Sequence, residues 1–138
     1  MPEKETLERA EEDRREGKSP STQAGEFVRE EIHHVREGKH GARSAKQAIA
    51  IGLSKARRAG VPLKPPARGK KGTKQQAARD VKKGRTQRGR KPSPRRSRAT
   101  LGALKKEGRR AASRTALSRQ ARRSRPATRR TSARGRKK

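Results

Sequence analysis

Hydrophobic side chains recur at helical spacing in the N-terminal half of the chain. They are separated by four, four and three positions and form a narrow apolar stripe. The members of the stripe are Ala24, Val28, Ile32 and Val35, with Phe27 beside them. Ser19 and Pro20 are typical of a helix start, and Gly38 of a helix end. The pattern predicts a helix over residues 22–37.

A second apolar face follows after a short polar segment. Ser44 stands three residues before Gln47, which is typical of a capping box, and Gly60 and Pro62 favour termination. A helix over residues 44–59 would place these small and apolar residues on one side: Ala45, Ile49, Gly52, Leu53 and Ala56. The two segments are expected to pack as a hairpin.

A further helix is predicted over residues 3–16, where Glu, Lys, Arg, Leu and Ala dominate and Gly17 follows. Only Leu7 and Ala10 are apolar there, so this helix would need a partner surface. The sequence therefore predicts a mainly α protein. Its head, over residues 1–62, is a small helical hairpin of two to three helices.

The apolar pattern ends at the prolines that begin with Pro62. The rest is rich in Arg, Lys, Ser, Thr, Gly and Ala, which cannot bury enough apolar surface to order itself. We expect residues 63–138 to form a long, largely disordered basic tail. Weak helical stretches are predicted near residues 73–83 and 100–123.

Charge separates the two parts. The 138 residues carry 43 Lys plus Arg and 13 Asp plus Glu, a formal net charge of +30. Residues 1–37 are net −4, whereas residues 61–138 hold 30 basic residues against Asp80 and Glu107. Only 25% of the residues are hydrophobic, which argues against an enclosed pocket and hence against an enzyme. No apolar run is long enough for a membrane span.

The basic tail gives the main indication of function, because its excess positive charge favours binding to an external polyanion such as a nucleic acid. Arginine outnumbers lysine there by 19 to 11, and no aromatic residue is present for base stacking. We therefore expect phosphate contacts without sequence reading, to DNA rather than RNA. The candidate nucleic-acid-binding residues are Arg85, Arg88, Arg90, Lys91, Ser93, Pro94, Arg95, Arg96, Arg98, Arg109, Arg110, Arg122, Arg123, Arg125, Arg129, Arg130, Arg134 and Arg136.

Two short motifs have both a functional and a structural interpretation. Ser93-Pro94-Arg95-Arg96 resembles the minor-groove turn of linker and sperm histones, or it is an accidental Ser-Pro in an Arg-rich segment. Gly38-Lys39-His40-Gly41 resembles the phosphate clamp of KH domains, although no strand pattern supports a KH fold. The possible phosphate loop comprises Gly38, Lys39, Gly41 and Arg43; the alternative is an ordinary interhelical turn.

No metal or cofactor is predicted. Glu30, His33 and Glu37 share one face of the predicted second helix, but a plain solvated face explains them better than a metal site that lacks ligands from other helices. Three histidines and no cysteine offer no catalytic triad.

Three segments resemble a bacterial domain family of unknown function. They are Glu26–Glu31, Gly38–Ser44 and Lys46–Arg57, of which Ala-Ile-Gly-Leu-Ser-x-Ala-Arg within the third is the most specific string. The family occurs in short, very basic proteins, some labelled plasmid stabilisation or histone-like. The resemblance covers roughly residues 1–63 and implies a bacterial cytoplasmic protein near DNA. It transfers no binding residue.

The leading hypothesis is a nucleoid-associated, histone-like protein that binds DNA by phosphate neutralisation. Its head would form dimers or hold a partner through Gln47, Ile51 and Arg58, which lie off the core face. One alternative is an RNA- or ribosome-associated basic protein. Another is a protein-interaction head that the tail merely tethers.

Overall fold

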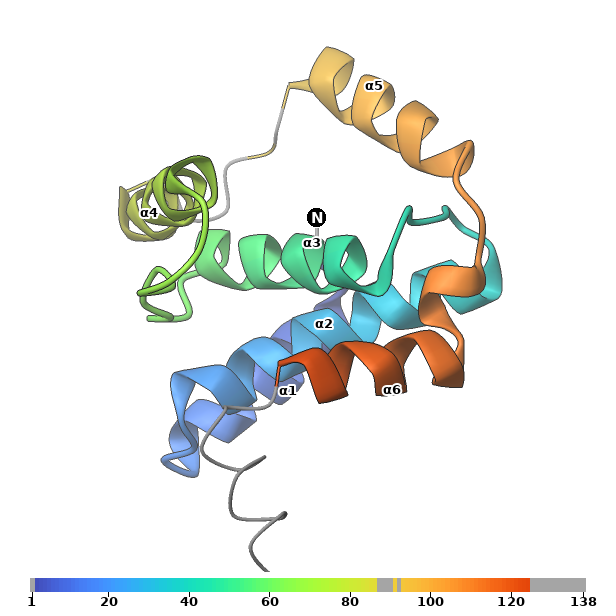
Figure 1. Cartoon of the computed structure of the whole chain (residues 1–138). Coiled ribbons are helices and arrows are strands. Elements are labelled where there is room, and N and C mark those ends of the chain that lie inside the picture. The colour runs from blue at the N-terminus through green and yellow to red at the C-terminus, as the bar shows by residue number, and fades with distance from the viewer. Residues whose placement is uncertain (1, 87–90, 92, 125–138) are drawn as a thin grey trace, which may run out of the picture.

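The computed structural model describes residues 2–86, 91 and 93–124. These parts contain six α-helices, one 3-10 helix and no strand (Figure 1). The helices are α1 Lys4–Arg15, α2 Pro20–Glu37, α3 Ala45–Arg58, α4 Lys71–Thr86, α5 Pro94–Lys105, η1 Arg110–Ala112 and α6 Arg114–Arg123. The mainly α prediction is confirmed, but the head is larger than the expected two to three helices.

The α2–α3 hairpin is built from the signals in the sequence. The Ser19 hydroxyl caps α2 by accepting from the Thr22 amide, and Gly38 ends it with φ 77°. The two helices cross closely at Gly52, where a Cβ atom would lie 2.6 Å from the Val28 Cα. The helices begin and end within two residues of the predicted bounds.

Helix α1 packs on α2 chiefly through polar groups. Glu30 of α2 accepts the Glu3 amide at 2.6 Å and the Thr6 hydroxyl at 3.2 Å. Ala10 is buried as expected, but Leu7 is 41% exposed. Helix α1 is therefore held on α2 mainly by the buried carboxylate of Glu30, with a small apolar contact at Ala10.

The region expected to be a disordered tail contains three α-helices, and α4 packs against α3. Ala77, Asp80 and Gly84 are buried at this contact. A Cβ atom on Gly84 would lie 2.0 Å from the Arg57 carbonyl oxygen, so the missing side chain permits the close approach. The weak helix predicted over residues 73–83 is thus a full packed helix.

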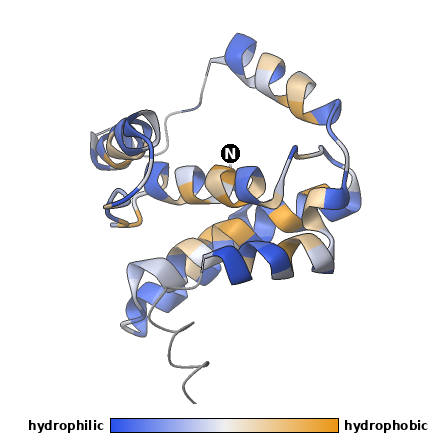
Figure 2. Cartoon of the chain, viewed as in Figure 1, coloured by the Kyte–Doolittle hydropathy of each residue, from blue (hydrophilic) through white to orange (hydrophobic). Residues whose placement is uncertain are grey.

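The second weak helix, predicted over residues 100–123, is divided into α5, η1 and α6. Ala111 and Ala112 of η1 join a core cluster with Val35, Ala42 and Ala48. A separate cluster centres on Phe27, which is 1% exposed. Figure 2 shows hydrophobic residues concentrated where α2 and α3 face each other. The alanines allow the 3-10 turn to lie flat on the hairpin, and this extends the head beyond residue 62.

Candidate nucleic-acid interface

Every exposed charged residue of helix α4 is positive. Its one carboxylate, Asp80, is 2% exposed and accepts hydrogen bonds from the Ser54 hydroxyl at 2.7 Å and the Gln76 amide at 3.2 Å. The carboxylate is thus used for packing against α3 and subtracts little charge from the outer face. The exposed cations of α4 are Lys71, Arg79, Lys82, Lys83 and Arg85.

The linker before α4 is held by Arg57. Its guanidinium donates to the Leu63 and Lys64 carbonyls, both at 3.3 Å. Burial lowers the pKa of Arg57, and the nearby Asp80 carboxylate opposes that shift. Arg57 therefore acts as a fixed link that positions the exposed Lys64 next to α4.

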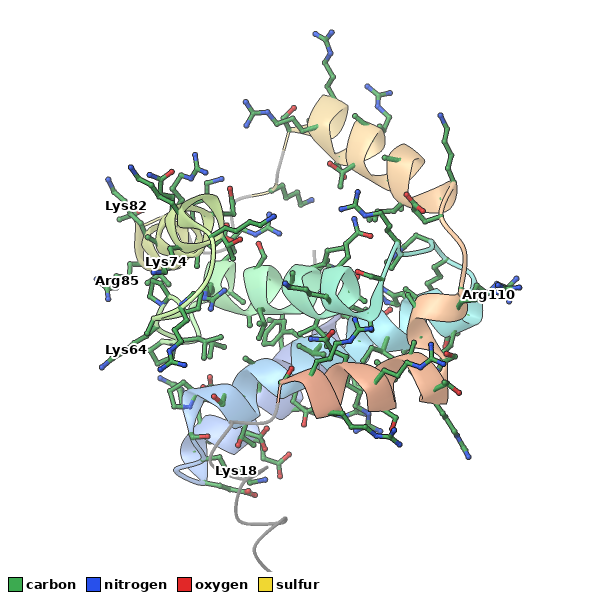
Figure 3. The ribbon with its side chains drawn as sticks, in the orientation of Figure 1. Lys18, Lys64, Lys74, Lys82, Arg85 and Arg110 are labelled. Atoms are coloured by element: carbon green, nitrogen blue, oxygen red, sulfur yellow. The ribbon has the colours of Figure 1, made fainter. Side chains whose placement is uncertain are left out.

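Figure 3 shows how these cations gather. Lys64, Lys74, Lys82 and Arg85 lie on the same side of the molecule, over the linker and α4, whereas Arg110 points away on the other side. We call these four residues, together with the other exposed cations of α4, the α4 surface. Of the predicted binding residues, only Arg85 belongs to it.

The Ser-Pro-Arg-Arg motif forms the start of α5. The Ser93 hydroxyl accepts the Arg96 amide at 3.5 Å, and Pro94 occupies the first turn. Lys91, Arg95, Arg96 and Arg98 are all exposed. Within the described part of the chain α5 packs on no other helix, so these cations remain open to solvent.

Three arginines surround a shallow pocket of about 280 Å³ beside η1. They are Arg36 of α2, Arg109 and Arg114, and the Arg36 Nε atom donates to the Ala112 carbonyl at 2.9 Å. The predicted Arg110 is exposed, and so are Arg122 and Arg123 at the end of α6. The other predicted residues lie outside the described residues: Arg88, Arg90, Arg125, Arg129, Arg130, Arg134 and Arg136.

The predicted phosphate loop contacts the protein's own C-terminal segment. The amide of Gly41 donates to the Leu104 carbonyl at 2.8 Å, and the amide of Ala42 donates to the Gly108 carbonyl at 3.1 Å. Lys39 and Arg43 are exposed, and the Lys39 ammonium pairs with Glu3 at 3.2 Å. Two amides that could hold a phosphate are therefore already satisfied by carbonyls.

Substituting Gly41 with alanine should release this contact, because the new Cβ atom would lie 1.9 Å from the Glu107 carbonyl oxygen. We expect hydrogen exchange at the amides of Ala42 and Ala112 to accelerate by about 10- to 100-fold, the value of one or two hydrogen bonds. Gly102→Ala is the control, because nothing lies within 4 Å of its Cβ position. Unchanged protection in Gly41→Ala would contradict the docking.

An acidic pocket of about 180 Å³ lies between α1 and α2, away from the α4 surface residues. Glu30, His33 and Glu37 all line it, but Glu30 is buried rather than solvated. A hydrogen bond with His34, and then Lys39, lowers the pKa of Glu3 at the rim. The same ion pair raises the pKa of Lys39. Much of the head's negative charge is concentrated here.

Sequence reasoning missed several residues that the fold brings to these surfaces. Arg36 and Arg114 are far apart in the sequence but line the same pocket, which no local pattern indicates. The α4 cations that were missed lie between Lys71 and Lys83, and their spacing around the buried Asp80 could have suggested one inward and one outward face.

Comparisons with known proteins identify a family resemblance in one part of the chain. Among the described residues, no helix has the length and apolar character needed to cross a membrane. Neither the curated proteins nor the solved structures include one that matches this chain. Residues 15–68, which extend from the end of α1 to the linker before α4, are similar to a family of unknown function (DUF6496).

Proposed function

We propose that the protein binds nucleic acid, with a preference for duplex DNA, by neutralising backbone phosphates. The observation that carries the proposal is the α4 surface, where the single carboxylate is buried and every exposed charge is positive. A folded helix presents these cations together at little further entropic cost, unlike a coil.

The chemistry favours the backbone over the bases. Between residues 61 and 138 the sequence has no aromatic side chain for stacking, and arginine and lysine bind phosphate regardless of sequence. We infer binding with little sequence preference. A nucleoid-associated role would follow, and RNA binding is the second outcome that the test below distinguishes.

The test is the salt dependence of binding by the full chain. For a duplex, the logarithm of the association constant should fall against log salt with a slope of about −0.9 per phosphate contacted, hence about −5 to −9 for six to ten contacts. Competition between duplex DNA and a structured RNA at one salt concentration assigns the preferred partner. A slope near zero would contradict phosphate neutralisation, and preference for RNA would replace the DNA assignment.

A further inference from the structure

A buried ionic cluster joins α2, the loop after it and α3. Glu31 is 0% exposed and His40 8% exposed, although both can carry charge. One oxygen of Glu31 accepts from the Lys55 ammonium, and the other, Oε2, lies 3.1 Å from His40 Nε2. His34 Nδ1 lies 3.9 Å from Glu31 Oε1. None of these residues belongs to the α4 surface.

Both imidazoles are held by their outer nitrogens. His40 Nδ1 lies 2.9 Å from the Gly41 carbonyl, and His34 Nε2 lies 3.1 Å from the Glu3 carboxylate. A carbonyl or an ionised carboxylate only accepts, so each outer nitrogen donates its proton. In the neutral tautomer that matches these contacts, the nitrogens nearest Glu31 are free to bind a metal ion. This outer-shell arrangement is the one that protein metal sites use to orient histidine ligands.

One oxygen of the Glu31 carboxylate, at the centre of the cluster, lacks a hydrogen-bond donor in the part of the chain that the structure describes. Among the described residues, Glu31 Oε2 has no hydrogen-bond partner, because the His40 contact lacks hydrogen-bond geometry. A buried carboxylate oxygen without a hydrogen-bond donor is unfavourable, and a positive group beside it offsets that cost. A metal ion bound between Glu31, His34 and His40 would supply that charge.

We propose that Glu31, His34 and His40 form a binding site for Zn²⁺ or a closely similar divalent ion. One ligand atom from each residue lies within 4.8 Å of the other two. Tetrahedral zinc ligands are about 3.3 Å apart, so binding requires the side chains to close by up to about 1.5 Å. Two histidines and one carboxylate suit zinc and leave a fourth position for water.

The surroundings provide both charge and access. Lys55 pairs with Oε1 of Glu31, and its ammonium also lies 3.6 Å from the Glu30 carboxylate. His34 and Glu3 line the acidic pocket between α1 and α2, so a cation reaches the cluster past carboxylates. The site would fasten the α2–α3 loop to α2 without any role for the cationic helices.

The decisive experiment is an imidazole NMR titration of the full chain with Zn²⁺ alone. The chain has three histidines, and the exposed His33 is an internal control on the same helix. We expect the His34 and His40 resonances to shift and saturate at one ion per chain, with His33 little changed. Shifts confined to His34 would place the ion on Glu3 and Glu30 and overturn the assignment, as would equal shifts at His33 or no saturable shift.

Variants provide a second measurement. His40→Gln should weaken zinc binding by about 100-fold or more, and Glu3→Gln, which alters only the outer shell, by about 10-fold. His33→Gln should leave the affinity unchanged, and an equal loss in His33→Gln would overturn the site. If His40→Gln fails to fold, the wild-type titration still decides, because its readout identifies the histidines directly.

Discussion

Replacing Lys71, Lys82, Lys83 and Arg85 with glutamine should weaken binding to duplex DNA by about 100-fold near 0.15 M salt and reduce the salt slope by about four, one for each lost phosphate contact. All four residues are exposed on α4, so the fold should survive. The measurement is a titration of labelled duplex at several salt concentrations, with helicity checked by circular dichroism.

The control carries the same change in net charge at a different place. Lys4, Arg9, Arg14 and Arg15 are exposed cations of α1, and changing them to glutamine also removes four charges. We expect the salt slope of this variant to change by less than about one, because α1 cations lie beside carboxylates such as Glu5, Glu8 and Glu11. Equal losses in both variants would mean that net charge, and not the α4 surface, governs binding.

The second large effect is expected on stability. Phe27 is the only aromatic residue of the chain, is 1% exposed, and lies in the cluster with Ala24, Ala56 and Val61. Because its buried neighbours are small, they cannot fill the space that Phe27→Ala leaves. We expect the free energy of unfolding to fall by about 3–5 kcal/mol and the Tm by roughly 10–20 °C.

Thermal unfolding followed by far-ultraviolet circular dichroism measures this loss. Leu7→Ala is the matched control, because Leu7 is 41% exposed on α1 and alanine favours helix. Its unfolding free energy should change by no more than about 0.5 kcal/mol. A similarly small change in Phe27→Ala would show that the Phe27 cluster does not hold the hairpin together.

The hairpin was predictable because its signals are local. Ser19, Gly38 and Ser44 act within one turn of their own helices, and the apolar stripe has the helical period. The burial of Glu30 and Glu31 was not, because carboxylates are normally exposed and their partners, Glu3, Thr6, His40 and Lys55, come from three other segments. A sequence pattern shows which residues share one face of a helix. It does not show which charged residues from other segments will pack against that face.

Weak helices were predicted in the C-terminal part, but their packing on the hairpin was not, for a related reason. Their contacts with the hairpin depend on alanine and glycine, such as Ala77, Gly84, Ala111 and Ala112, and such residues add little to an apolar pattern. The cationic character of the candidate interface could be predicted from composition alone. Its position could not, because Asp80 has to be buried before the outer face of α4 becomes uniformly positive.

The cluster of Val35, Ala42 and Ala48 with η1 also has a consequence during synthesis. The hairpin leaves the ribosome well before Ala111 and Ala112 do. The face of the hairpin that η1 will cover is therefore exposed until the last third of the chain emerges. Contacts between distant parts of a sequence slow folding. The surface exposed in that interval consists mainly of the small side chains of alanine and valine. A chaperone or a second nascent chain would therefore bind it only weakly.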